Sequence, residues 1–109
     1  MKAIPQILDG TKYRSRTEAR WSRFFDLAGM DYEYEAEGYM LEVGWYVPDF
    51  WLSESGVYFE VKGTLPNGRE VAVAQALARY KGVPVVVAMG NPSPGVVLRV
   101  FMPDSAPWN

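Results

Sequence analysis

The segment PDFWLSESGVYFEVK, residues 48–62, decides the fold that we expect for this chain. Two apolar, β-prone runs flank Ser53-Glu54-Ser55-Gly56, a turn of the length found in β-hairpins. The runs predict two antiparallel strands, over residues 45–52 and 57–62. If Ser53 and Gly56 close a two-residue loop, Asp49 lies directly opposite Glu60.

This pairing sorts the side chains of the hairpin onto two faces. Directly opposed residues project to the same side, so we expect Asp49, Glu60 and Lys62 together on one face. A one-residue slip in register would scatter them. The other face is apolar and is expected to be core; it comprises Tyr46, Pro48, Phe50, Leu52, Val57, Phe59 and Val61.

Two opposed carboxylates with Cβ atoms about 5 Å apart repel each other and need compensation. A Mg²⁺ ion compensates such a pair, because it prefers hard oxygen ligands and completes its shell with water and phosphate. Lys62 alone could also neutralise one acid, which would make the group an ordinary cross-strand ion cluster. Pro48 favours the first interpretation, because proline marks bends that re-aim neighbouring side chains.

A helix is expected upstream of the hairpin, capped by Ser15 and ended by Gly29. Glu18 stands three residues after Ser15, as in a capping box. The predicted buried stripe of this helix consists of Trp21, Phe24, Phe25 and Ala28.

The remaining segments complete an α/β pattern. The apolar run after a small-residue helix predicts a strand buried on both faces and a parallel crossover from the hairpin. In chain order we expect an irregular lead-in over 1–13 that ends at the turn Asp9-Gly10, a strand at 32–35, and a strand or bulge between Gly38 and Gly44. After the hairpin we expect a helix over 69–81 stopped by Gly82, strands over 83–89 and 96–102, and a loose tail over 103–109. The chain is thus expected to be one domain, residues 1–109 with a core from about 12 to 102, built on a mixed central sheet flanked by helices in the order α-β-β-β-α-β with a C-terminal strand.

Composition excludes several kinds of site. The chain of 109 residues is 49% hydrophobic and 22% charged, as in ordinary globular proteins, and it has neither cysteine nor histidine. Thiolate metal sites, disulfides and histidine-based triads are therefore excluded, and any catalysis has to use carboxylates, lysine, arginine, tyrosine or serine. There is no apolar run of bilayer length and no signal-peptide core near Met1, so we expect a cytoplasmic protein without membrane association.

Charge is unevenly distributed along the chain although the net charge is only −2. Residues 12–23 carry five basic residues against one acid, whereas residues 31–60 carry eight acids and no base. A basic element beside an acidic one suits an enzyme that grips a phosphate backbone around a metal site. Two separate solvated faces would give the same pattern.

Taken together, these motifs resemble the PD-(D/E)XK nuclease superfamily, which has the restriction-endonuclease-like fold. The resemblance rests on Pro48-Asp49, on Glu60-Val61-Lys62 followed by Gly63, and on the upstream helix with Glu18. It covers residues 12–89, and the phrases SRTEARW, PDFWL and FEVKG are similar to small nucleases of phage and bacterial origin in particular.

The resemblance implies a Mg²⁺-dependent endonuclease that hydrolyses DNA phosphodiester bonds, with Mn²⁺ as a substitute ion. Asp49, Glu60 and the backbone carbonyl of Val61 would hold the metal, and Lys62 would orient the attacking water. Glu18 matches an acid that touches the metal or one of its waters, although its position also fits a capping box for Ser15, and it could serve both roles in alternating states.

Other residues receive weaker assignments. Gln75 loosely matches an auxiliary polar residue on the second helix. Trp51 and Tyr58 share the face of Asp49 and could stack on a base or simply pack under a helix. Candidates for phosphate contacts are Arg14, Arg16, Arg20 and Arg23.

Two alternatives stay open at this point: a catalytically silent nucleic-acid-binding subunit of the same fold, and a nuclease active only with a partner, as a homodimer or within a larger nuclease complex. If the acids form the site, crowding should raise the pKa of Asp49 or Glu60 in the metal-free protein.

Overall fold

The computed structural model describes residues 5–104, which form two helices and nine strands. In chain order these are β1 (Gln6–Leu8), β2 (Thr11–Tyr13), α1 (Arg16–Leu27), β3 (Glu33–Tyr34), β4 (Tyr39–Leu41), β5 (Gly44–Tyr46), β6 (Phe50–Leu52), β7 (Val57–Lys62), α2 (Gly68–Lys81), β8 (Val85–Met89) and β9 (Val97–Phe101). Neither helix combines the length and apolar character needed to cross a bilayer.

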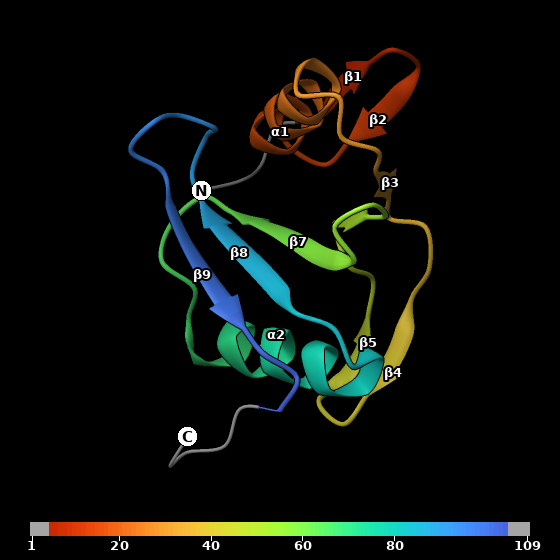
Figure 1. Cartoon of the computed structure of the whole chain (residues 1–109), viewed down its shortest axis with the longest axis vertical. Coiled ribbons are helices and arrows are strands. Elements are labelled where there is room, and N and C mark those ends of the chain that lie inside the picture. The colour runs from red at the N-terminus through yellow and green to blue at the C-terminus, as the bar shows by residue number, and fades with distance from the viewer. Residues whose placement is uncertain (1–4, 105–109) are drawn as a thin grey trace.

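The central sheet has five strands in the order β3-β6-β7-β8-β9, and two short hairpins, β1–β2 and β4–β5, lie outside it. Strands β7 and β8 are parallel, and the other neighbours in the sheet are antiparallel. Figure 1 shows α1 with β1–β2 at one end of the molecule and α2 with β4–β5 at the other. The α/β class, the mixed sheet and the parallel connection through α2 are as predicted.

The hairpin register is also as predicted. Phe50 pairs with Phe59 and Leu52 with Val57, which extrapolates to Asp49 opposite Glu60. The turn closes through a 2.8 Å hydrogen bond from the Gly56 N–H to the Leu52 carbonyl. Gly56 has a φ of 70°, a conformation that glycine adopts without a Cβ penalty.

Both faces of the sheet are covered by separate hydrophobic clusters. The cluster under α1 contains Tyr13, Ala19, Trp21, Phe25, Phe50, Leu52, Phe59, Val61 and Ala88. The cluster under α2 contains Leu41, Tyr58, Val73, Ala74, Ala76, Leu77, Ala78, Val85, Val87 and Phe101. Strand β8 contributes to both clusters, which confirms that it is buried on two sides.

The prediction of one continuous strand over residues 45–52 is wrong. Strand β5 ends at Tyr46 and pairs with β4, whereas β6 begins at Phe50 in a different sheet. Pro48 lies in the break, where its missing N–H and fixed φ do not suit a central strand. Because the chain bends here, Tyr46 leaves the predicted apolar face and packs with the α2 cluster instead.

The N-terminal lead-in is more ordered than predicted. Residues 6–13 form the β1–β2 hairpin around Asp9 and Gly10, which have φ values of 50° and 81°. Two positive φ angles in a two-residue loop are typical of the turns that join twisted strands. Within the predicted C-terminal tail, Pro103 and Asp104 form a turn, and residues 105–109 lie outside the described part of the chain.

The helix ends agree with the sequence, but the stripe on α1 is shifted. Ser15 caps α1, and α2 begins at the capping box of Asn67 and ends at Gly82. Phe24 is 44% exposed and Ala28 is exposed. The buried residues of α1 are Glu18, Ala19, Trp21, Ser22 and Phe25. They lie on the side of the helix centred on Trp21 and Phe25, one turn apart, so Phe24 and Ala28 lie at the edge of that side.

Candidate functional site

Asp49 and Glu60 are joined by crossed hydrogen bonds at the open end of the β6–β7 hairpin. The Asp49 N–H donates to Glu60 Oε2 at 2.7 Å, and the Val61 N–H donates to Asp49 Oδ2 at 2.8 Å. Each acid is only 2% exposed. The predicted proximity of the two carboxylates is therefore confirmed.

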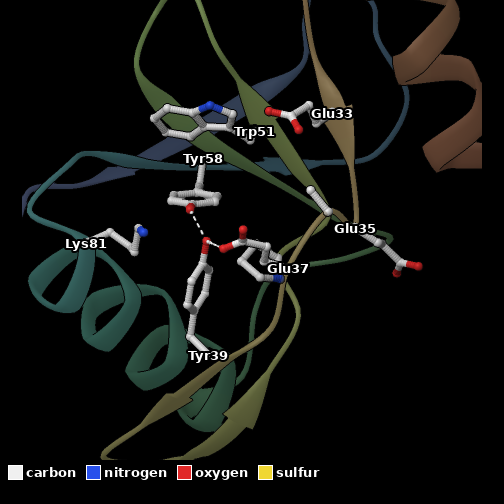
Figure 2. Close-up of a pocket in the computed structure, with 9 residues that line it drawn as sticks. Glu33, Glu35, Glu37, Tyr39, Trp51, Tyr58 and Lys81 are labelled. Atoms are coloured by element: carbon white, nitrogen blue, oxygen red, sulfur yellow. Dashed lines mark hydrogen bonds between the residues drawn. The ribbon is translucent and has the colours of Figure 1, made fainter.

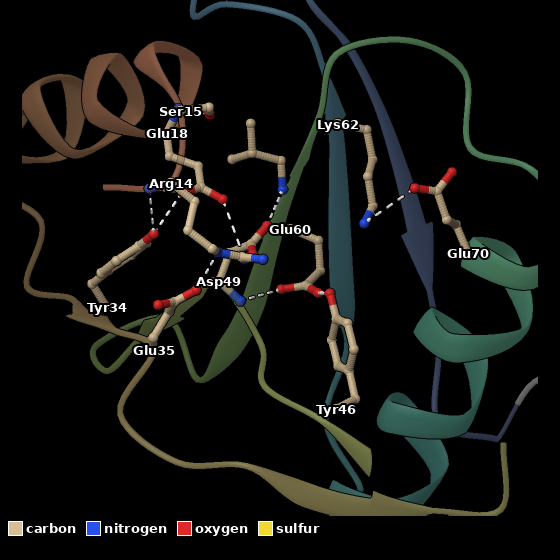
Figure 3. A network of polar contacts seen from close by, with 11 residues as sticks. Arg14, Ser15, Glu18, Tyr34, Glu35, Tyr46, Asp49, Glu60, Lys62 and Glu70 are labelled. Carbon is tan, nitrogen blue, oxygen red and sulfur yellow. Dashed lines mark hydrogen bonds and ion pairs between the residues drawn. The ribbon is translucent and has the colours of Figure 1, made fainter. Parts of the chain in front are cut away.

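The second oxygen of each carboxylate also has a partner. Arg14 donates from Nη2 to Asp49 Oδ1, and the Tyr46 hydroxyl donates to Glu60 Oε1. Figure 3 shows the Arg14 guanidinium lying among the acids, with Tyr46 on the far side of Glu60. Arg14 keeps 57% of its side chain exposed, so this cation lies at the surface of an otherwise buried acid cluster.

Glu18 of α1 is the third acid of this cluster and is 5% exposed. Its carboxylate accepts from the Tyr34 hydroxyl at 2.5 Å and from the Arg14 N–H at 2.9 Å, and it forms an ion pair with the Arg14 side chain at 3.3 Å. Its own N–H donates to Ser15 Oγ at 3.1 Å. Half of the predicted capping box is thus present, but the carboxylate bonds to Arg14 and not to the Ser15 N–H, which leaves it facing the acid cluster.

The sequence did not single out Glu35, which completes the surroundings of Arg14. Its carboxylate pairs with Arg14 Nε, and its N–H donates to the Asp49 carbonyl at 2.9 Å. Glu35 has a φ of 46°, an uncommon conformation for a residue with a side chain. The alternation of residues 32–35 predicted an exposed strand position here, and that pattern carries no sign of such a backbone turn.

Burial is the main influence on the electrostatics of the pair. The pKa of Asp49 is raised well above its ordinary value, mainly by burial and then by the charges of Glu60 and Glu18. Burial likewise raises the pKa of Glu60, although hydrogen bonds from Tyr46 and the Asp49 N–H oppose the rise. The predicted direction is confirmed, but loss of water contributes more than crowding does.

Lys62 lies on the same side of β7 as Glu60 and is half-buried. Its Nζ is 3.5 Å from Glu70 Oε2 in the first turn of α2, and its charge lowers the pKa of Glu60 in part. A cavity of about 260 Å³ adjoins it, lined by residues that include Tyr46, Arg69 and Glu70. Lys62 is thus the cation at the α2 side of the acid pair, and Arg14 is the cation at the α1 side.

No family model matches this chain, and no match was found among curated proteins or solved structures. What the site can do chemically therefore rests on its own geometry.

The other predicted site residues lie outside this cluster. Arg16, Arg20 and Arg23 are exposed on α1 and line a cavity of about 280 Å³, and Arg20 donates to Asn91 Oδ1 at 3.1 Å. Arg14 turns away from them toward the acids. Gln75 donates to the Met102 carbonyl at 2.9 Å, at the end of the sheet opposite Lys62, and so does not join the acids.

The donor set fits a hard divalent cation in kind, because three buried carboxylates converge around one exposed guanidinium. In the conformation described for residues 5–104, no three acidic side chains are grouped as a metal site. Arg14 and Tyr46 instead hold the oxygens of Asp49 and Glu60 that the backbone leaves unbonded. Metal binding would thus require the Arg14 guanidinium to withdraw from Asp49.

Proposed function

We propose that this protein is a Mg²⁺-dependent endonuclease with a restriction-endonuclease-like core that hydrolyses phosphodiester bonds in DNA. The observation that carries the proposal is the buried Asp49–Glu60 pair at the end of a hairpin, with Lys62 on the same face of β7. Burying two carboxylates side by side destabilises the fold, and an ordinary surface ion cluster would not be buried in this way. Such a pair is well suited to hold a divalent cation.

The residues divide the chemistry among them. Asp49, Glu60 and the Val61 carbonyl would hold Mg²⁺, with Glu18 as a direct ligand or a ligand through water, and Mn²⁺ would substitute. When bound, the ion would supply an activated water and polarise the scissile phosphate. Lys62 orients the attacking water and stabilises the negative charge that develops on the phosphate.

The exposed arginines of α1 would hold the phosphate backbone. Arg16, Arg20 and Arg23 lie on the solvent side of the same helix that presents Glu18 to the acids from its buried side. A DNA strand lying along these cations would contact the outer side of the helix whose inner side faces the acid cluster. Arg14 would leave Asp49 when metal enters and contact a phosphate in its place.

A partner-dependent or catalytically silent DNA-binding subunit is the second candidate. The observation that favours it is the Arg14–Asp49 ion pair, which neutralises part of the acid cluster. A homodimer or a larger nuclease complex would be the means of releasing this arginine.

Cleavage assays with a catalytic-lysine variant test the proposed activity. Supercoiled plasmid, single-stranded circles, flaps and four-way junctions are incubated with protein in Mg²⁺, Mn²⁺ or EDTA. We expect metal-dependent cleavage that falls at least about 100-fold in Lys62→Ala, since this removes a group acting on the transition state. Lys81→Ala is the matched control and should cleave normally, because Lys81 is the last residue of α2, whereas Lys62 contacts Glu70 in the first turn of that helix. A folded protein that cuts no substrate with either metal would favour the silent or partner-dependent subunit.

Arg14 offers a second test, which separates metal binding from DNA binding. Arg14→Gln frees Asp49 Oδ1 and removes a positive charge, so Mn²⁺ should bind several-fold more tightly, as measured by electron paramagnetic resonance. The same variant should bind DNA more weakly, because it loses a phosphate contact. Arg23→Gln removes an equal charge from the exposed side of α1, and we expect it to weaken DNA binding alone. Unchanged or weaker Mn²⁺ binding in Arg14→Gln would refute the proposal that Arg14 leaves Asp49 when metal enters.

A further inference from the structure

A third cavity, also of about 260 Å³, lies between the segment 33–37 and the end of α2. Figure 2 shows its aromatic wall, formed by Tyr39, Trp51 and Tyr58, with acidic side chains from the segment 33–37 beside it. Glu35 borders the cavity, but its carboxylate points away, toward Arg14. The cavity is therefore distinct in its chemistry from the acid cluster around Asp49.

The aromatic wall is built on two neighbouring strands of the central sheet and one strand of the β4–β5 hairpin. Trp51 and Tyr58 are directly opposed on β6 and β7, with ring centroids 4.8 Å apart and planes at 47°. Tyr39 meets Tyr58 edge-on, and their hydroxyl oxygens are 3.0 Å apart. Tyr58 is 6% exposed and packs in the α2 cluster, so the wall is anchored in the core.

Two carboxylates give this wall a negative electrostatic environment. Glu37 accepts from the Tyr39 hydroxyl at 3.0 Å. Burial, the hydrogen bond with Tyr39 and the charges of Glu37 and Glu33 together raise the pKa of Tyr58. Both acids are exposed at the mouth of the cavity, so they can reach a bound group.

The protein already places a cation on this wall. The Lys81 ammonium lies 4.5 Å from the centroid of the Tyr39 ring, within the range of a cation–π interaction. Lys81 comes from the exposed last residue of α2, and its flexible side chain can leave without disturbing the core. It shows what kind of group the ring face accepts.

We propose that this cavity binds an organic cation, a guanidinium or alkylammonium group that stacks on Tyr39 and Trp51, with the buried Tyr58 supporting both rings, and pairs with Glu33 and Glu37. A delocalised guanidinium both stacks on aromatic faces and bonds to carboxylates, so it matches the wall and the mouth together. The group displaces Lys81 from the Tyr39 ring. Its source is a basic side chain of a protein partner or a free polyamine, which present the same chemistry.

This assignment differs from base stacking by Trp51 and Tyr58. Carboxylates at the mouth repel the phosphates that accompany a nucleobase, and Tyr58 is buried in the α2 cluster. The cation site does not depend on the proposed nuclease activity.

A titration followed by nuclear magnetic resonance tests the proposal without any activity assay. The Trp51 indole N–H signal is assigned with Trp51→Phe, and N-acetylarginine amide is titrated into the metal-free protein. We expect a saturable shift of that signal with N-acetylarginine amide and none with N-acetylcitrulline amide, which has nearly the same shape but no charge. Equal responses to both compounds, or no saturable response to any cation, would overturn the cation site.

Variants with opposite expected effects sharpen the result. Glu33→Gln with Glu37→Gln should weaken binding roughly tenfold, whereas Lys81→Gln should strengthen it because the competing ammonium is gone. The control pair Glu42→Gln with Glu54→Gln removes the same charge from exposed positions elsewhere and should have little effect. If the control pair weakens binding as much, the attraction is only a net-charge effect and the site is refuted. Spermidine and an arginine-containing peptide are titrated in parallel. The compound that binds more tightly identifies the source of the cation, a free polyamine or a protein partner.

Discussion

The two faces of strand β7 are equally buried but opposite in chemistry. Phe59 and Val61 point into the α1 cluster, where apolar burial stabilises the fold. Glu60, between them in sequence, points to the other side and is 2% exposed, less than Phe59 at 5%. The strand therefore removes a carboxylate from water as completely as it removes an aromatic ring.

The difference shows where burial lowers the stability of this fold. A buried carboxylate beside another destabilises the charged state, and the raised pKa of both Asp49 and Glu60 reflects that cost. Every oxygen of the pair has a hydrogen-bond donor, which limits the penalty. Phe59 and Val61 thus stabilise the fold through the α1 cluster, whereas Glu60 and Lys62, on the opposite side of the same strand, belong to the candidate site.

The largest effect on stability is expected from removing a large side chain from the α1 cluster. Phe50→Ala should lower the free energy of unfolding by about 3–5 kcal/mol, since Phe50 is fully buried and contacts the rings of Phe25 and Tyr34. Urea unfolding followed by fluorescence measures the loss. Phe24→Ala, the matched change at an exposed position of α1, should cost roughly 1 kcal/mol. Similar losses in the two variants would show that the α1 cluster does not dominate stability.

The apolar face could be predicted from sequence because strand geometry has a period of two. The turn over 53–56 sets a register that places Phe50, Phe59 and Val61 together and Asp49 opposite Glu60. Helix ends were equally predictable, since they depend on local capping residues. These features involve residues close together in sequence or a single well-marked turn.

The surroundings of the acids could not be predicted in this way. Tyr46 reaches Glu60 only because the chain bends at Pro48, and that bend breaks the period on which its assignment rested. Arg14 and Glu35 meet across 21 positions of sequence through a backbone turn that no local pattern marks. Long-range polar contacts of this kind depend on how the elements pack, which residue spacing does not encode.

A smaller effect on stability is expected from removing the buried charge of Asp49. In EDTA at alkaline pH, Asp49→Asn should be more stable than the wild type, because it keeps an oxygen for the Val61 N–H without a buried charge. The folded-state pKa of Asp49 is raised, so the wild type is favoured at low pH and loses stability as the pH rises through that pKa. The advantage of Asp49→Asn should therefore shrink on acidification.

Thermal unfolding from pH 4 to 9 tests this pH dependence, with Asp31→Asn as the matched control at an exposed position. A constant difference between Asp49→Asn and wild type across the range would contradict a raised pKa at Asp49. Added Mg²⁺ should stabilise the wild type more than the variant, because only the wild type keeps the full charge of the acid pair.

The smallest effect separates stability from chemistry at the start of α1, where Ser15 and Glu18 lie three residues apart. Ser15→Ala removes the acceptor for the Glu18 N–H and should cost about 1 kcal/mol of unfolding free energy, without changing Mn²⁺ affinity. Glu18→Gln keeps that cap and acceptors for Tyr34 and Arg14, but it removes a charge from the acid cluster, so it should weaken Mn²⁺ binding. Urea unfolding and Mn²⁺ titration on both variants measure the two quantities. If Ser15→Ala weakened metal binding as much as Glu18→Gln, the carboxylate would act only by holding the helix end, and Glu18 would belong with the stabilising residues of the α1 side.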